Sequence, residues 1–263
     1  QLAGKILARV PEFRGEYHEP FLGGGAIFFA LRPRRARLSD VNPELVNAFI
    51  AVRDNVGPLM GLLGEHAANH CREHYYEVRA WDRVSGFDSL PPVVRAARFI
   101  YLNRACFNGV WRTNAKGQNN VPLGVESVSF DMKNLQAASR ALSEADIACR
   151  GFAEACELVS AGDFVYLDPP YIPLSRTAAF TTYFKGGFGN ADQEALAAQC
   201  AAHILRGAHL ILSNSDTSET VRIYGLPGFE LEHMNGVRRH VGADNAARGR
   251  VRELLVKGPK LAA

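Results

Sequence analysis

The four residues Asp168-Pro169-Pro170-Tyr171 carry the clearest chemistry in this sequence. They follow a short apolar run, 164–167, whose aromatic and branched residues predict a buried strand. Two prolines cannot continue a sheet, so we expect a stiff loop at the carboxyl end of that strand, where open α/β sheets hold ligands. The loop offers a carboxylate, a carbonyl without an adjacent N–H and an aromatic face, the groups needed to hold a flat ring that bears an amino group. A plain proline turn with an exposed aspartate is the alternative, and four residues alone do not decide.

A glycine-rich segment near the start of the chain predicts a second part of the site. Residues 16–20 are typical of a strand, Gly23-Gly24-Gly25 of a loop, and the apolar residues from Ile27 of a helix. Such a loop lets the backbone approach a ligand closely. The next expected strand, 36–39, ends in Asp40, roughly 20 residues after the loop, where a carboxylate can accept hydrogen bonds from ribose hydroxyls. Asp40 could instead cap a helix, but the combination favours a nucleoside-binding half-domain.

The remaining pattern predicts an α/β core with an insert. Asn42 should cap a helix that has Pro43 at its first position and a buried stripe of Leu45, Val46, Phe49 and Ile50. From about residue 55 the apolar spacing becomes helical, without another glycine-loop strand. We therefore expect a mainly helical insert over 55–135 in a core formed by 1–54 and 136–263. The core should also contain helices over 133–143 and 191–206, strands over 147–149 and 208–213, and a closing hairpin of 229–234 and 252–256.

The helix over 191–206 has the clearest end signals of the chain. Asn190 and Gln193 resemble a capping box, and Gly207 follows its last turn.

A polar stretch at 103–124 interleaves Arg104, Arg112 and Lys116 with Phe107 and Trp111. Turn signals at 108–109 and 116–117 predict a hairpin. Arginine, asparagine and glutamine make paired contacts to base edges, and aromatic side chains stack on bases or wedge between them. The alternative is an ordinary loop rich in asparagine and glycine.

A second basic segment lies between the last two expected strands and contains Arg238, Arg239, His240, Arg248 and Arg250. It could be a solvated face or a phosphate-contacting loop, and the sequence favours neither.

The composition permits a polyanionic partner, since the net charge is +3 and the pI is about 8.6. Five scattered cysteines without a CxxC pair indicate free thiols, not disulfides or a zinc site. No apolar run has the length of a membrane span, and the start lacks the apolar segment of a signal peptide. We expect a cytoplasmic protein that binds no metal.

Taken in order, these segments resemble DNA adenine-N6 methyltransferases of the Dam type. In this class the cofactor loop comes first, the target-recognition domain second and the catalytic loop last. The resemblance covers nearly the whole chain and rests on the segments 19–25, 40–42, 101–122, 168–183 and 213–217.

The resemblance implies a Rossmann-like methyltransferase fold, with a mostly parallel sheet closed by an antiparallel hairpin and a target-recognition domain over 55–135. It implies S-adenosylmethionine as cofactor, double-stranded DNA as partner and adenine N6 as target, with GATC the leading sequence. It also implies a bacterial or phage-encoded enzyme of the kind found in restriction-modification systems, and we expect a monomer or a weak dimer. The implied catalytic loop is Asp168, Pro169, Pro170 and Tyr171. The implied cofactor residues are Lys5, Glu19, Phe21, Gly23, Gly25, Asp40, Phe152 and Asp168. The implied DNA-contacting residues are Arg104, Phe107, Asn108, Val110, Arg112, Lys116, Asn120 and Pro122.

An exocyclic amine is a poor nucleophile because its lone pair is delocalised into the ring. The Asp168 carboxylate and the Pro169 carbonyl would accept its two N–H bonds, favour pyramidal geometry and stabilise the developing positive charge, while Tyr171 would stack on the ring.

Three other hypotheses stay open at this point. A cytosine-N4 methyltransferase more often has serine at position 168, and an RNA or protein amide methyltransferase more often has asparagine there. The third is an inactive DNA-binding relic, which would not need Asp168, Tyr171, Gly23 and Asp40 intact.

Overall fold

The computed structural model describes residues 2–173, 187–238 and 250–259, and the chain divides into two compact units. Unit 1 consists of Gln1–Val41 and Glu144–Ala263, and unit 2 consists of Asn42–Ser143. Unit 2 is longer at both ends than the insert expected over 55–135. The reason is packing, because helix α3 (Pro43–Asp54) and helix α7 (Met132–Leu142) contact each other and other helices of unit 2.

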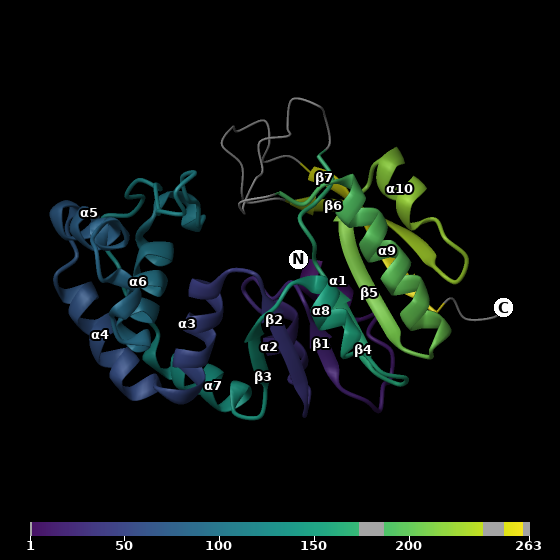
Figure 1. Ribbon diagram of the computed structural model, residues 1–263, viewed down its shortest axis with the longest axis horizontal. Coiled ribbons are helices and arrows are strands. Elements are labelled where there is room, and N and C mark those ends of the chain that lie inside the picture. The colour runs from purple at the N-terminus through teal and green to yellow at the C-terminus, as the bar shows by residue number, and fades with distance from the viewer. Residues whose placement is uncertain (1, 174–186, 239–249, 260–263) are drawn as a thin grey trace. The chain divides into compact units, whose positions relative to one another are not determined.

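The described residues of unit 1 form a seven-stranded sheet in the order β3-β2-β1-β4-β5-β7-β6 (Figure 1). Strands β1 to β5 are parallel to one another, whereas β7 runs antiparallel to both β5 and β6. The sequence expectation of a mostly parallel sheet with a closing antiparallel hairpin is therefore confirmed. The strands are β1 (Tyr17–Glu19), β2 (Ala36–Asp40), β3 (Asp146–Cys149), β4 (Phe164–Leu167), β5 (His209–Ser215), β6 (Glu230–Arg238) and β7 (Arg250–Gly258).

Parallel pairing places the carboxyl ends of β1, β2, β4 and β5 at one edge of the sheet. The helices of unit 1 are α1 (Leu2–Leu7), α2 (Ala26–Leu31), α8 (Phe152–Glu157), α9 (Asn190–Leu205) and α10 (Ser218–Tyr224). Helices α8 and α9 pack beside one another (Figure 1), and α9 also contacts β5. The core there is apolar and includes Val165, Leu196, Cys200, Leu210 and Val256.

The start of α9 differs from the expected capping box of Asn190 and Gln193. The cap is Gly189, whose backbone N–H donates to the Asp192 carboxylate at 2.8 Å. The expected pairing was therefore one residue out of register. Gln193 instead points into the protein, where only 1% of it is exposed.

Unit 2 is helical as expected, with α4 (Val56–Ala68), α5 (Arg72–Ala80) and α6 (Pro92–Ala105) between α3 and α7. Single 3-10 turns lie at Trp81–Arg83, Phe87–Ser89 and Phe107–Gly109. The Asn42 side chain caps α3, accepting hydrogen bonds from two backbone N–H groups. The expected stripe of α3 was only partly correct. Val46 is buried, but Leu45, Phe49 and Ile50 are half-buried, and the other buried positions are Ala48, Ala51 and Val52.

The hairpin expected over 103–124 is shorter than predicted. Helix α6 continues through Arg104 to Ala105, because Tyr101, Leu102 and Ala105 extend its buried face. Beyond it, the described backbone forms two isolated β-bridges, Cys106 to Leu123 and Thr113 to Asn119, in place of a continuous ladder. We call residues 106–125 the recognition loop.

The closing strands are longer than predicted, so Arg238 and Arg250 belong to β6 and β7 and not to a loop. Arg239, His240 and Arg248 lie outside the described residues. All five cysteines are free, as expected. No helix among the described residues is long and apolar enough to span a membrane.

Candidate active site and nucleic-acid interface

The Asp168 carboxylate lies at the sheet edge where the parallel strands end. Strand β4 is buried along its whole length, and Asp168, the next residue, is exposed. Its Oδ1 accepts a 2.7 Å hydrogen bond from the hydroxyl of Ser213, which is wholly buried in the neighbouring strand β5. The Tyr166 hydroxyl lies 3.1 Å from the same Ser213 oxygen. Two buried hydroxyls therefore hold an exposed carboxylate in one orientation.

The rest of the loop is stiff and partly buried. Pro169 is buried, Pro170 is exposed and Tyr171 is half-buried. Burial, together with the charges of Asp168 and Glu253, raises the pKa of the Tyr171 hydroxyl, so this group is a neutral phenol at physiological pH. The expected continuation of the site over 174–183 lies outside the described residues.

A second carboxyl group, that of Glu19, ends strand β1 but is only 2% exposed. Burial raises its pKa to about 8; the Tyr17 hydroxyl, which donates to it at 2.8 Å, lowers the pKa, and the charge of Asp168 raises it further. Glu19 is therefore mostly protonated at neutral pH, a neutral neighbour of the Asp168 charge. Among the described residues, no group of three or more His, Cys, Asp or Glu side chains could hold a metal ion.

The glycine loop joins β1 to α2 and contacts the end of β2. Gly23 and Gly25 have φ of 47° and 63°, a left-handed conformation that explains why glycine is needed at both. The Gly23 N–H donates to the Asp40 carboxylate at 3.1 Å, which joins the loop to the acidic residue predicted to act with it. A Cβ built on Gly23 or Gly24 would meet no atom within 4 Å, so the loop borders open space.

Three aromatic rings gather beside this loop. The rings of Phe21 and Phe152 are stacked with centroids 6.0 Å apart, and Phe188 packs edge-on against both, at 5.6 Å and 5.5 Å. The sequence predicted Phe21 and Phe152 as cofactor neighbours, but it missed Phe188, which lies in a segment without a strand or helix signal. Lys5 lies in α1, which packs against α2.

In unit 2, the recognition loop presents exposed basic side chains. Arg112 is exposed, and its Nε donates to Asn120 Oδ1 at 2.8 Å, while the Asn120 backbone N–H donates to the Arg112 carbonyl at 3.2 Å. This side-chain bond uses the Nε of the guanidinium. Lys116 is exposed at the tip of the loop, and Arg104 is exposed at the end of α6.

The apolar residues of this loop divide into packed and exposed ones. The Trp111 ring packs on the buried Phe99 with centroids 4.4 Å apart and is half-buried. Phe107 is 51% exposed, and beside it Asn108 adopts a positive φ of 58°. Pro122 is exposed and Val110 is half-buried. Of the two aromatic side chains considered for contact with a base, Phe107 is the more exposed one.

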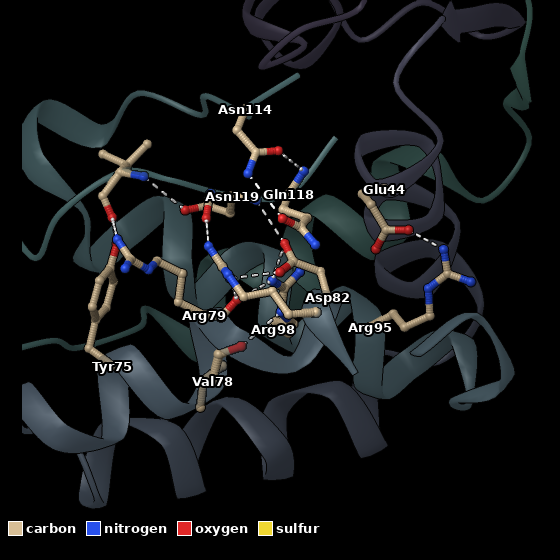
Figure 2. A network of polar contacts seen from close by, with 12 residues as sticks. Glu44, Tyr75, Val78, Arg79, Asp82, Arg95, Arg98, Asn114, Gln118 and Asn119 are labelled. Carbon is tan, nitrogen blue, oxygen red and sulfur yellow. Dashed lines mark hydrogen bonds and ion pairs between the residues drawn. The ribbon is translucent and has the colours of Figure 1, made fainter. Parts of the chain in front are cut away.

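A buried charge network holds the base of the recognition loop (Figure 2). Arg98, only 1% exposed, bonds the Asp82 carboxylate at 2.8 Å and the Val78 carbonyl at 2.9 Å. Asp82 also accepts the backbone N–H of Asn119 at 2.7 Å, and Arg83 bonds the Asn119 carbonyl at 2.6 Å. The Asn119 backbone is therefore fixed on both sides by charged groups. The sequence does not reveal this network, because Asp82 and Asn119 are 37 residues apart in the chain.

Comparison with known proteins agrees with these features. A sequence model of the D12 class N6 adenine-specific DNA methyltransferases matches residues 1–238. The type II methyltransferase M1.LlaDCHI of Lactococcus lactis subsp. cremoris is 37% identical over 97% of this chain and 90% of its own length. The DNA adenine methylases of Vibrio cholerae and Escherichia coli K12 are 33% and 32% identical, over 97% and 90% of this chain and 90% and 84% of their own lengths. With its Rossmann-like sheet, its Asp-Pro-Pro-Tyr loop and these relatives, the chain belongs to the D12 class of N6 adenine-specific DNA methyltransferases.

Proposed function

We propose that this chain transfers the methyl group of S-adenosylmethionine to N6 of an adenine flipped out of a short DNA sequence, with GATC the leading candidate. One observation carries the proposal. The exposed Asp168 carboxylate, held by Ser213, lies at the same sheet edge as the contact between Gly23 and Asp40. Strand β1 leads into the glycine loop and pairs with both β2 and β4, so adjacent strands bring both groups together.

The residues at this edge suit the proposed cofactor. The open space beside Gly23 and Gly24 leaves room for a ligand against the backbone. Asp40 is an acceptor for ribose hydroxyls, and the rings of Phe21, Phe152 and Phe188 form an apolar surface. Glu19 and Lys5 are proposed as further neighbours of the cofactor. S-adenosylmethionine, when bound, supplies an electrophilic methyl group on a positively charged sulfur.

Asp168 and Pro169 are proposed to act on the amine. The carboxylate and the carbonyl accept its two N–H bonds and aim the nitrogen lone pair at the methyl group. A methyl group donated by S-adenosylmethionine would leave the S–C electron pair on sulfur and a positive charge on the amine nitrogen. The Asp168 carboxylate and the Pro169 carbonyl would stabilise that charge until one proton passes from the nitrogen to water. The ring cannot be reached inside a duplex, so the base has to leave the stack, and Tyr171 is proposed to stack on it.

Unit 2 is proposed to read the DNA through its recognition loop. With Nε tied to Asn120, the two terminal nitrogens of Arg112 can reach guanine O6 and N7 together, a pair of acceptors that no other base offers. Val110 and Pro122 could contact a thymine methyl group. Phe107 and Asn108 could fill the gap that the flipped adenine leaves in the base stack. Arg104 and Lys116 are proposed to hold phosphates, which fixes register without reading sequence.

The test is methylation of DNA duplexes in which each base pair of the candidate site is substituted in turn. We expect turnover on GATC and loss of most turnover on every single substitution within it. Equal methylation of all duplexes would contradict the proposed sequence, and methyl groups found on cytosine would favour the cytosine-N4 alternative. The variant Glu157→Ala, which removes an exposed carboxylate in α8, is the control.

A further inference from the structure

We propose that Gln193 is a positioning residue for methyl transfer, which sets the Asp168–Tyr171 loop through a buried network with Asn214 and Tyr224. The inference rests on the proposed role of Asp168 and Pro169 as acceptors for the amine. It concerns side chains on α9, β5 and α10, whose hydrogen bonds go to backbone atoms of Pro170 in the loop and of Ile172 directly after it.

The network bonds the loop at two backbone atoms. Gln193 Nε2 donates to the Pro170 carbonyl at 2.7 Å, and Asn214 Oδ1 accepts the Ile172 N–H at 3.0 Å. The two amides also bond each other, since Asn214 Nδ2 donates to Gln193 Oε1 at 3.2 Å. The Tyr224 hydroxyl donates to the same Oε1 at 2.6 Å, which fixes the amide with its nitrogen facing Pro170. Each of these four hydrogen bonds pairs a donor with an acceptor, so the network is consistent as a whole.

These groups are expensive to bury. Gln193 is 1% exposed, and Asn214 and Tyr224 are fully buried. A buried amide or hydroxyl costs free energy unless it is hydrogen-bonded, so packing alone would favour apolar residues here. Their neighbours show what packing selects, because Leu196 and Cys200 on the same helix and Leu212 on β5 are apolar and buried.

The loop needs such support because it has few donors of its own. Pro169 and Pro170 have no backbone N–H, so sheet pairing cannot hold this segment. The bond from Gln193 goes to the Pro170 carbonyl and not to the Pro169 carbonyl, the one assigned to the amine. Gln193 therefore fixes the peptide next to the proposed acceptor without competing for it. A displacement of about 1 Å in a reacting geometry can cost on the order of 100-fold in rate.

Three variants test the inference, with kcat and KM for S-adenosylmethionine measured on unmethylated genomic DNA well below each melting temperature. Gln193→Met keeps the length of the side chain but removes its hydrogen bonds, and we expect kcat to fall about 10- to 100-fold with KM changed by less than about twofold. Tyr224→Phe removes one hydroxyl and keeps the packing, so we expect a smaller fall in kcat of about 3- to 10-fold. Ile204→Ala, a change in a half-buried side chain on the same helix about three turns beyond Gln193, is the matched control for lost packing and should keep kcat.

Gln193→Glu gives a readout that a purely structural role would not move. The introduced carboxyl can donate to the Pro170 carbonyl only when protonated, and burial raises its pKa. We expect its kcat relative to the unmodified protein to rise as pH falls, over a range in which circular dichroism shows both proteins folded. A flat ratio, or folded Gln193→Met and Tyr224→Phe with kcat within about twofold of the unmodified protein, would overturn the inference. Asp168→Ala, assayed in parallel, separates the two proposals: if it too stays active, the proposed function fails as well.

Discussion

Replacing Asp82 by alanine should destabilise unit 2 and leave unit 1 intact. Asp82 is 10% exposed and bonds Arg98, which is 1% exposed, at 2.8 Å. It also accepts the Asn119 N–H at 2.7 Å and pairs with Arg83 at 2.8 Å. Removing one partner of a buried ion pair leaves an uncompensated charge and costs about 3–5 kcal/mol. The pair of Arg53 and Asp54 in the same unit is the matched control, because its 2.8 Å contact leaves Asp54 45% exposed and is worth below about 1 kcal/mol.

The assay is urea unfolding followed by tryptophan fluorescence. Both tryptophans of the chain, Trp81 and Trp111, lie in unit 2, so the signal reports on that unit. We expect Asp82→Ala to lower the free energy of unfolding by several times the loss in Asp54→Ala. In protein that is still folded, KM for DNA should rise, because Asn119 holds the recognition loop, while the affinity for S-adenosylmethionine should stay unchanged. An equal loss of stability in the two variants would show that the buried network does not hold the loop.

The remaining predictions concern the cofactor, the DNA and pH. Asp40→Ala should weaken S-adenosylmethionine binding by about 1.5–3 kcal/mol in calorimetry, through loss of a charged acceptor, and unchanged affinity would remove Asp40 from the site. Arg112→Ala should cost about 1–3 kcal/mol on the cognate duplex and relax preference at one base pair, whereas Lys116→Ala should weaken all sequences alike and reduce the salt dependence of binding. An equal loss on every substrate would make Arg112 a phosphate contact. In the folded protein Glu19 has a pKa of about 8 and keeps a proton that the unfolded chain, with a pKa of 4.5, releases. The stability of the folded protein should therefore fall as the pH rises from 4.5 towards 8. Glu19→Gln should reduce that fall in pH-dependent denaturation, and an identical pH profile would contradict the raised pKa.

The features that the sequence predicts best are local ones. The apolar run 164–167 forms strand β4, which ends just before the Asp-Pro-Pro-Tyr loop as the prolines indicate. Asp40 is the last residue of strand β2, as expected. The glycine loop also lies where the run Gly23-Gly24-Gly25 indicates, between strand β1 and helix α2. Asn42 with Pro43 likewise marks the start of α3.

The features that the sequence did not predict depend on tertiary packing. Helix α6 runs on to Ala105 because its last turn is buried, although Asn103 and Arg104 have the character of a loop. The sequence predicts Gln193 as part of a capping box. In the structure its Nε2 instead donates at 2.7 Å to the carbonyl of Pro170, which is 23 positions away in the chain. Ser213 was part of a recognised segment, but only the pairing of β4 with β5 reveals its bond to Asp168.

Methyl transfer itself tests the central claim most directly. The chain and its Asp168→Ala variant would be incubated with S-adenosylmethionine labelled in the methyl group and unmethylated DNA, and the digested nucleosides analysed by mass spectrometry. We predict labelled N6-methyladenine from the unmodified chain and none from Asp168→Ala, with circular dichroism showing that both proteins are folded. Label on cytosine, no label in DNA, or turnover by Asp168→Ala within about tenfold of the unmodified chain, roughly 1.4 kcal/mol, would contradict the account.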